Sequence, residues 1–283
     1  MMAQFLNRLA GQVAVVTGAG CIAEYIGIGR AIALSLAKHG ATVIALDRSA
    51  DAAIITANMI LKAGGKALAI EADARDHPQV KSAMEKCHQQ FREIDILVNC
   101  VGGGKIGGAI ETTHSSWQEA LDLNLSSAFI CSNAVLPMMV QQKRGAIVHI
   151  GSLHGTRYPG TDMLGYCVAK AGLMQLSRCI ALEFAAQGIR SNTVLAGAVD
   201  TPEIRRRFSQ NYGAENVDAV MAIRDRNIPQ GKCATVWDVA NAALFLVSED
   251  AKHITGTELA VDGGASAVTV PSYVNEARMK FGR

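Results

Sequence analysis

The sequence has no long block of one charge, no long hydrophobic run and no recognisable signal peptide. Its 27 basic and 25 acidic residues are scattered along 283 positions and give a formal net charge of +2, so nucleic acid is not an expected partner. No uninterrupted apolar segment approaches the roughly 18 residues of a membrane-spanning helix. The N-terminus lacks a basic start followed by an apolar stretch and a cleavage site. We therefore expect a soluble, cytoplasmic protein that does not associate with membranes.

The cysteines lack the spacing of a metal or redox motif. None of the seven forms a C-x-x-C pair, and several lie in segments that read as strands or helices, so we expect reduced core residues. No cluster of metal ligands is visible, and no metal is predicted. With 49% hydrophobic and 18% charged residues, the composition favours a packed protein whose sheet is buried on both faces.

Short runs of β-branched or aliphatic residues alternate with amphipathic segments. One such segment starts at Gly29, places Ile32 and Leu36 at helical spacing and ends at Gly40. This alternation predicts an α/β fold with a doubly wound, seven-stranded parallel sheet of the Rossmann-like type, in a single domain over residues 1–283. The predicted strands are residues 13–16, 42–46, 67–70, 95–99, 146–150, 191–195 and 258–261. Ligands of such sheets bind at the carboxyl ends of the strands.

A cluster of glycines follows the first predicted strand and opens the next helix. Gly18, Gly20, Gly27 and Gly29 would bring backbone amides close to a pyrophosphate at the helix N-terminus. Asp47 follows Gly29 by 18 residues, close to the offset at which a carboxylate accepts from a ribose hydroxyl and repels the 2′-phosphate of NADP. The neighbouring Arg48 could instead pair with that phosphate. Asp47 favours NAD, and NADP stays the alternative.

Four further residues suggest proton chemistry. In YCVAK, Tyr166 and Lys170 share one face of a predicted helix. The lysine ammonium and a positive nicotinamide ring would favour the phenolate and lower the pKa of Tyr166 from its ordinary value near 10. Ser152 follows a strand at its carboxyl end, and Asn124 lies in LDLNLSS. A parallel sheet would gather these groups near one cleft.

These motifs together resemble the short-chain dehydrogenase/reductase family, in its single-domain branch. The likeness extends over about residues 11–264 and includes TGAG…GIG, Asp47, Asp73, NCVGG at 99–103, YCVAK and VDGG at 261–264. It implies an oxidoreductase that transfers a hydride between NAD and a secondary alcohol or ketone. It also implies that Tyr166 is the acid/base, that Lys170 lowers its pKa and holds the nicotinamide ribose, that Ser152 binds the reacting oxygen and that Asn124 helps to hold a relay water.

The resemblance and the motifs also assign cofactor contacts. Asp73 and the backbone after it would contact adenine, and Asn99 would stabilise the central strands. The expected cofactor-binding set is Gly18, Gly20, Gly27, Ile28, Gly29, Asp47, Arg48, Asp73, Ala74, Asn99, Val101, Gly102, Tyr166, Lys170, Gly197, Val199 and Thr201.

The sequence departs from the family pattern in three places. Residues 21–26 stand where the family normally has one residue, and we expect this five-residue insertion to bulge outward while the pyrophosphate contacts survive. Ser152 and Tyr166 are one residue further apart than is usual in the family, and we expect the extra residue to lie in the loop between them. Ala196-Gly197 replaces the frequent Pro-Gly, and residues 198–201 are still expected to offer contacts to the carboxamide.

Residues 201–232 correspond to the substrate lid of the family. This segment is polar and basic, and Arg205 to Arg207 either bind an acidic substrate group or form a solvated face. The residues expected to line the substrate pocket are His154, Tyr158, Met163, Leu164 and Val199. They suggest a moderately apolar alcohol or ketone as substrate. Helices that begin near Ser115 and Gly165 resemble those through which family members form dimers and tetramers, so a homo-oligomer is expected. The tail at 265–283 extends past the usual family end.

Three alternatives stay open. A 3-oxoacyl-carrier-protein reductase has similar motifs but usually prefers NADP, against which Asp47 argues. An enoyl-thioester reductase shares the fold and a stretched glycine loop, but its tyrosine and lysine are typically further apart. A non-catalytic NAD-binding sensor or scaffold would not need Asn124, Ser152, Tyr166 and Lys170 together.

Overall fold

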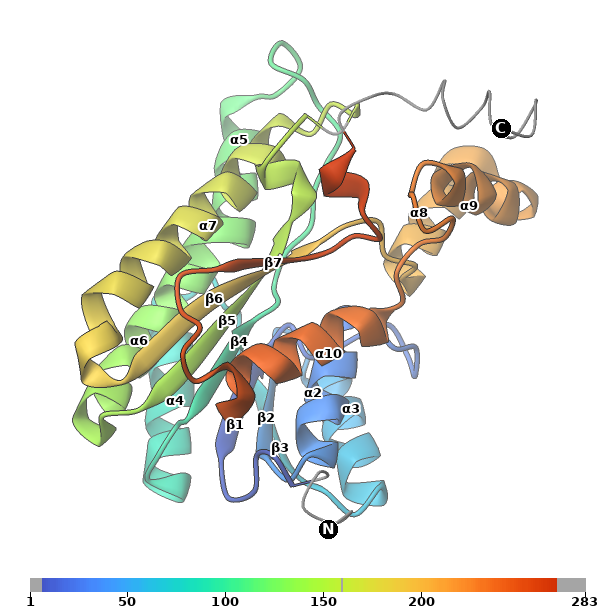
Figure 1. Cartoon of the computed structure of the whole chain (residues 1–283). Coiled ribbons are helices and arrows are strands. Elements are labelled where there is room, and N and C mark those ends of the chain that lie inside the picture. The colour runs from blue at the N-terminus through green and yellow to red at the C-terminus, as the bar shows by residue number, and fades with distance from the viewer. Residues whose placement is uncertain (1–6, 159, 269–283) are drawn as a thin grey trace.

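The seven predicted strands form one parallel sheet. A computed structural model describes residues 7–158 and 160–268, and its strand order is β3-β2-β1-β4-β5-β6-β7 (Figure 1). The strands are β1 Val13–Thr17, β2 Thr42–Asp47, β3 Lys66–Glu71, β4 Ile96–Asn99, β5 Gly145–Ser152, β6 Ile189–Ala196 and β7 Glu258–Val261. The doubly wound sheet is therefore confirmed.

Helices cover both faces of the sheet because successive strand residues point to opposite sides. Ala14 and Val16 of β1 pack in the cluster that contains α2 and α10, whereas Val13 and Val15 pack in the cluster that contains α4, α6 and α7. The main helices are α2 Ile28–Lys38, α3 Ala50–Lys62, α4 His77–Phe91, α5 His114–Leu121, α6 Ser127–Gln142, α7 Leu164–Phe184, α8 Pro202–Tyr212, α9 Val217–Arg226 and α10 Val236–Val247.

The order of the strands reverses between β1 and β4. The chain runs outward from β1 to β3 on one side and from β4 to β7 on the other, and sheets of this kind bind their ligands at such a switch point, outside the carboxyl ends of β1 and β4. Thr17 pairs with Asn99 in this register. The glycine loop follows β1 directly, and β5 ends at Ser152 on the same edge of the sheet. The predicted functional residues therefore lie along this edge of the sheet.

The predicted lid contains two helices. Helices α8 and α9 stand apart from the two helical layers, beyond the carboxyl end of β6 (Figure 1). Ile204 and Phe208 of α8 pack against Met221 of α9 and against Ile228 and Cys233. The lid thus has a small core of its own. The predicted tail continues past a short turn at Ala265–Ala267, and its residues 269–283 lie outside the described part of the chain.

One helical run is long and apolar enough to cross a membrane by length and composition. It extends over His114–Gln142 and consists of α5, a short π-helix and α6. In this fold Cys131, Val135 and Met139 of α6 pack into the core beneath the sheet. A single such helix is weak evidence for a membrane span, because core helices of soluble proteins have the same composition.

Candidate active site

Tyr166, Lys170 and Ser152 meet at the carboxyl end of β5. One turn of α7 separates Tyr166 from Lys170, and the Nζ atom of Lys170 lies 5.7 Å from the centroid of the Tyr166 ring. Nζ also donates to the carbonyl oxygen of Ile150 at 2.8 Å, which fixes the buried lysine to the strand that ends in Ser152. The Ser152 hydroxyl accepts from the backbone amide of His154 at 3.2 Å. The structure therefore brings these three predicted residues together.

Burial dominates the acid–base properties of this group. It raises the pKa of Tyr166, although a hydrogen bond with Ser152 and the positive charge of Arg207 favour the phenolate. The chain's own groups thus do not produce the predicted lowering of this pKa, because removal of the phenol from water outweighs the nearby charge. Burial also lowers the pKa of Lys170 to about 8, against the opposing effect of Cys100.

Asn124 fixes the loop after β4. It is fully buried in a π-helix at Asp122–Ser126, and such bulges are frequent at functional sites. Its side-chain nitrogen donates to the carbonyl oxygens of Gly103 at 2.8 Å and Ala120 at 3.0 Å, and its oxygen accepts from the Gly103 amide at 3.0 Å. A Cβ atom on Gly102 would lie 2.9 Å from Asn124 Oδ1 and 3.1 Å from Lys170 Nζ. Asn124 therefore adjoins Lys170 and holds the NCVGG segment in place.

The glycine loop is tightly closed on the start of α2. Gly18 has φ +64°, a left-handed conformation that favours glycine. A Cβ atom on Gly29 would lie 2.0 Å from the Gly18 carbonyl oxygen, so no side chain fits there. Helix α2 begins at Ile28, and its N-cap Gly27 provides no side-chain hydrogen bond. Its first-turn amides are thus available to an anion, as a pyrophosphate requires.

The insertion is wrapped around a buried arginine. The guanidinium of Arg30, which is fully buried, donates to the carbonyl oxygens of Ala23 at 2.7 Å, Cys21 at 3.2 Å and Tyr25. Its Nε atom donates to the Thr56 hydroxyl at 2.9 Å. The Tyr25 side chain is 63% exposed, which agrees with the predicted outward bulge. Sequence analysis did not single out Arg30, although it directly follows the last glycine of the motif.

Asp47 is held by two backbone amides at the end of β2. One carboxylate oxygen accepts from Gly20 at 2.9 Å and the other from Ser49 at 3.0 Å. The amide proton of Gly20 is therefore used by Asp47, and a Cβ atom on Gly20 would lie 2.7 Å from the same carboxylate oxygen. Arg48 is exposed.

The predicted adenine contact already has a partner within the protein. The Asp73 carboxylate accepts from Arg75 Nε at 2.9 Å, and this hydrogen bond lowers the pKa of Asp73. Ala74 is buried. Asp73 and Arg75 lie on the rim of a polar hollow of about 770 Å³ between the β3–α4 loop and α5.

Asn99 points into the protein toward a histidine that sequence analysis did not identify. Its Nδ2 atom lies 3.1 Å from Ser132 Oγ, to which it donates, and 3.3 Å from His149 Nδ1. Burial and the Lys170 charge lower the pKa of His149 to about 3, so the ring is neutral. These contacts link β4 and β5 to α6. No sequence motif marked His149, because only the strand register makes it the neighbour of Asn99.

The segment after β6 is anchored near the predicted carboxamide site. The Gly197 amide donates to the Val261 carbonyl oxygen at 3.0 Å, and a Cβ atom on Gly197 would lie 2.8 Å from Asp262 Cα. Val199 is buried. The Thr201 hydroxyl caps α8 by accepting from the Ile204 amide at 3.2 Å, and it donates to no acceptor within the described residues.

Three of the four predicted substrate residues lie near Tyr166. The His154 ring packs edge-to-face on Tyr166 with centroids 5.8 Å apart. A Cβ atom on Gly104 would touch Met163 Cε at 2.2 Å and Tyr166 Cγ at 3.0 Å, and the Leu164 amide donates to the Gly107 carbonyl oxygen at 3.1 Å.

Tyr158 is exposed, and its place in the substrate pocket stays a prediction. It is 73% exposed and donates its hydroxyl to Asp162 at 2.8 Å.

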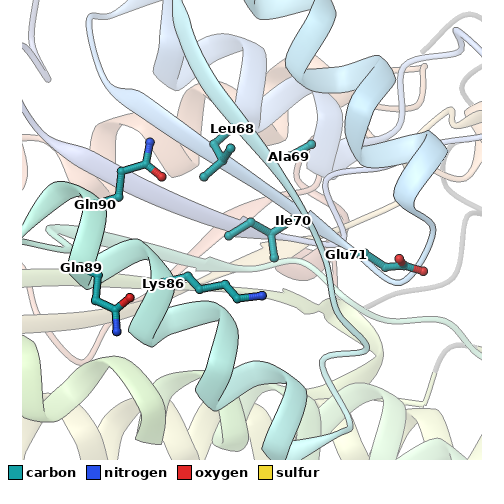
Figure 2. Close-up of a pocket in the computed structure, with 7 residues that line it drawn as sticks. All are labelled: Leu68, Ala69, Ile70, Glu71, Lys86, Gln89 and Gln90. Carbon is teal, nitrogen blue, oxygen red and sulfur yellow. The ribbon is translucent and has the colours of Figure 1, made fainter.

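Another hollow, of about 710 Å³, lies at the outer edge of the sheet. Figure 2 shows the side chains that line it, which come from β3 and α4: Leu68, Ala69, Ile70, Glu71, Lys86, Gln89 and Gln90. None of the predicted site residues lines it. Within the described residues, no group of three His, Cys, Asp or Glu side chains could hold a metal ion.

Known proteins match almost the whole chain. The family profile described as enoyl-(acyl carrier protein) reductase matches residues 22–266. The 2,5-dichloro-2,5-cyclohexadiene-1,4-diol dehydrogenase LinX of Sphingobium indicum is 34% identical over 260 residues, which cover 92% of this chain and 98% of LinX. The 3-oxoacyl-[acyl-carrier-protein] reductase FabG of Escherichia coli K12 is 36% identical over 254 residues, which cover 90% of this chain and 97% of FabG.

A crystal structure of a short-chain dehydrogenase/reductase from Burkholderia xenovorans superimposes with a TM-score of 0.89. It has 40% sequence identity, and the match covers 93% of this chain and 100% of that one. Sequence, fold and site geometry lead to the same conclusion: the chain belongs to the short-chain dehydrogenase/reductase family of oxidoreductases.

Proposed function

We propose that this protein transfers a hydride between NAD and a secondary alcohol or ketone, with Tyr166 as the group that exchanges the proton. The observation that carries the proposal is the meeting of Tyr166, Lys170 and Ser152 at the carboxyl edge of the sheet, beside the glycine loop. The family and the fold imply a nicotinamide cofactor. A phenol, an ammonium and a hydroxyl at that edge are the groups that a carbinol–carbonyl interconversion requires.

The residues present fit the cofactor. The first-turn amides of α2 and the close approach of Gly18 and Gly29 suit a pyrophosphate. Asp47 would accept from the adenosine ribose and repel a 2′-phosphate, which favours NAD over NADP. The backbone of Gly102 packs so closely against Lys170 that a Cβ atom would lie 3.1 Å from Nζ, and the Lys170 ammonium would hold the other ribose. When bound, the nicotinamide supplies the hydride acceptor or donor.

The chain's own residues handle the proton and the substrate oxygen. Ser152 would hydrogen-bond that oxygen and hold it against the Tyr166 hydroxyl. Since burial raises the pKa of Tyr166, the phenol is protonated at neutral pH and can donate its proton when a ketone is reduced. In the opposite direction, the phenolate would remove the proton from an alcohol, and the Lys170 ammonium would favour that anion.

The test is the Tyr166→Phe variant, assayed with NAD and NADP against a panel of secondary alcohols and ketones in both directions. Loss of the proton-transferring group should lower kcat by about 10² to 10⁴-fold, while the Kd for the cofactor, from calorimetry, stays within about threefold of the wild-type value because the ring remains. Near-native turnover of this variant would refute the mechanism. Cofactor binding by the wild type without turnover of any compound would instead favour a sensor or scaffold.

A second candidate function is the reduction of 3-oxoacyl thioesters, which the 36% identity to FabG favours. It predicts NADPH-dependent turnover of acetoacetyl thioesters at a kcat/KM above that of simple ketones. Asp47 argues against this reading, since its carboxylate would repel the 2′-phosphate. The family profile also includes enoyl reductases by its description, and an enoyl thioester belongs in the same panel.

We further propose that the protein is a homo-oligomer whose subunits meet through α6 and α7. Large apolar side chains are exposed on these helices: Phe129 on α6, and Val168 and Leu182 on α7, the last with 79% exposure. Exposed apolar groups on two adjacent helices favour association. Light scattering should give the mass of a dimer or tetramer, and a monomer at micromolar concentration would contradict the proposal.

A further inference from the structure

The arginines of the lid divide into two kinds. Arg205 binds Asp200 through two hydrogen bonds of 2.7 Å and Asp218 through one of 3.0 Å. Arg206 binds both carboxylate oxygens of Glu203, at 2.9 and 2.7 Å. Both side chains are nearly half exposed. These two arginines therefore stabilise the outer surface of α8 and carry no unpaired charge.

Arg207 faces the other way. It lies three residues after Ile204 and one before Phe208, the two α8 residues that pack into the lid core, and residues at this spacing share a helix face. Its side chain is half-buried. No described carboxylate lies within ion-pair distance of it, and its positive charge reaches Tyr166, where it acts to lower the pKa of the phenol.

Arg224 of α9 approaches the same place from the second lid helix. Its guanidinium carbon lies 5.7 Å from the centroid of the Phe208 ring, and Nη1 donates to the carbonyl oxygen of Val199 at 3.3 Å. Val199 belongs to the segment after β6 at the carboxyl edge of the sheet. Within the described residues, Arg224 likewise has no carboxylate in ion-pair distance. Most of its hydrogen-bond donors remain available.

His154 links this pair of charges to the reacting centre. Its ring packs on Tyr166, and the Arg224 charge, together with burial, lowers its pKa. Its Nδ1 atom is buried and has no hydrogen-bond partner among the described residues. The charges of the two guanidinium groups therefore act on the reacting centre, that of Arg207 on Tyr166 and that of Arg224 on His154.

The acidic residues of the lid already have other partners. Asp200, Glu203 and Asp218 hold Arg205 and Arg206 as described above, and Asp225 accepts from the Cys233 amide at 2.7 Å. Hydrogen bonds lower the pKa of Glu203 and Asp225, and the charges of Arg207 and Arg224 lower it further. Neither guanidinium forms an ion pair with a described carboxylate, so both can still bind an anion of a ligand. Guanidinium groups bind carboxylates in a planar, two-bond geometry.

We propose that the substrate is a secondary alcohol or ketone that also carries a carboxylate, and that Arg207 and Arg224 bind this carboxylate. This inference rests on the proposed function and names its substrate class. The carboxylate would lie on the lid side of the pocket, while Met163 and Leu164 contact the chain between it and the reacting carbon. Binding of the anion by residues of both lid helices would hold α8 and α9 over the bound substrate.

The experiment compares ketones that carry a carboxylate with the corresponding uncharged methyl esters. The probes are 4-oxopentanoate and 5-oxohexanoate, each against its methyl ester, reduced with NADH by the wild type and by Arg207→Gln, Arg224→Gln and Arg206→Gln. The wild type should prefer each acid by at least about tenfold in kcat/KM, since hydrogen bonds to a charged group are stronger than those to a neutral ester. The Arg207 and Arg224 variants should lose this preference through KM, and Arg206→Gln should keep it.

Two further measurements test whether the arginine substitutions act through the stability of the protein or through turnover instead of through substrate binding. Arg207→Lys keeps the charge and should retain part of the preference, with a thermal midpoint close to that of the wild type. In Tyr166→Phe, which lacks the proton donor, calorimetry with the cofactor present should still detect binding of 5-oxohexanoate and weaker binding of its ester. This readout does not depend on turnover.

Equal kcat/KM values for acids and esters in the wild type would overturn the inference, as would a preference that persists in both Arg207→Gln and Arg224→Gln. In either case, if the protein still reduces ketones, the proposed function is not contradicted. Failure to reduce any ketone or oxidise any alcohol, with the cofactor bound, would overturn the proposed function and this inference with it.

Discussion

The backbone amide of Gly20 donates to the carboxylate of Asp47 at 2.9 Å, and this hydrogen bond joins the glycine loop to the end of the neighbouring strand. The residue predicted to choose between NAD and NADP is therefore also a structural support of the loop that would bind the pyrophosphate. The Ser49 amide, at 3.0 Å from the second carboxylate oxygen, completes its fixation. Substitutions of Asp47 can therefore test the effect of its negative charge separately from that of its hydrogen bonds.

Replacement of Asp47 by Asn should change the cofactor preference with little effect on the loop. The amide oxygen can still accept from Gly20, and only the hydrogen bond from Ser49 is lost because the side-chain nitrogen cannot accept. The negative charge that repels a 2′-phosphate is gone. We expect the ratio of kcat/KM for NAD to that for NADP to fall at least about tenfold, the equivalent of about 1.4 kcal/mol. Asp47→Ala removes both functions and should also weaken the binding of both cofactors. An unchanged ratio in Asp47→Asn would contradict the assignment.

Replacement of Arg30 by Gln should disorder the insertion. The guanidinium holds the carbonyl oxygens of Cys21, Ala23 and Tyr25, and loss of such charged hydrogen bonds in a buried place costs about 3 kcal/mol or more. Thermal unfolding should show a lower midpoint, and the Kd for NAD should rise because the insertion adjoins the pyrophosphate loop. Arg48→Gln, at an exposed position nearby, is the matched control for stability. Wild-type NAD affinity in Arg30→Gln would show that the insertion is independent of the cofactor site.

Reduction of a ketone should slow at alkaline pH. Burial lowers the pKa of Lys170 to about 8, so its ammonium is present below that pH and is lost above it. Since Tyr166 keeps its proton over this range, the decline in kcat/KM above about pH 8 reports Lys170. In Lys170→Arg the charge persists, because arginine does not titrate in proteins, and the alkaline limb should move up by more than one pH unit. A profile that is the same in both proteins would assign the limb to another group.

His149 should make the protein less stable as the pH falls. Its pKa is about 3 in the folded chain and 6.5 when unfolded, so the unfolded state binds more protons below 6.5, and stability present above 6.5 is lost toward 3. From pH 7 to pH 5 this group alone should remove about 2 kcal/mol of unfolding free energy. Urea unfolding of His149→Gln, which does not titrate, should show a correspondingly smaller loss between these two pH values. Equal losses of unfolding free energy in the wild type and in His149→Gln would show that His149 is not the cause of the pH dependence.

Two alanine substitutions should distinguish the glycines around the insertion. In Gly29→Ala the new methyl group would lie 2.0 Å from the Gly18 carbonyl oxygen, so the loop must open and NAD binding should weaken by more than about tenfold. In Gly27→Ala the nearest atom is Cys21 Sγ at 3.2 Å, and that side chain can move. Calorimetric Kd values for NAD should therefore separate the two variants. Comparable losses in both would mean that the close approach of Gly29 to Gly18 is not the reason for the glycine.

The sequence alone was sufficient to predict features that depend on neighbouring residues. The seven strands and the helix that starts beside Gly29 follow from short β-branched or aliphatic runs and from apolar residues at helical spacing. The parallel arrangement follows from the alternation of these strands with helices. The pairing of Tyr166 with Lys170 on one face of α7 follows from their spacing of one helical turn. These features are local, so nearby residues determine them in any fold that contains the elements.

Only the tertiary structure decided which distant groups meet and how deeply they are buried. Residues 205, 206 and 207 are all arginine, yet Arg205 and Arg206 bind lid carboxylates whereas Arg207 is half-buried and its charge acts on Tyr166. The packing of the lid core, which fixes the rotation of α8, decides this difference. Burial likewise raised the pKa of Tyr166, where the adjacent lysine alone suggested the reverse. Desolvation and long-range contacts depend on the whole packed chain, and no short segment of the sequence encodes them.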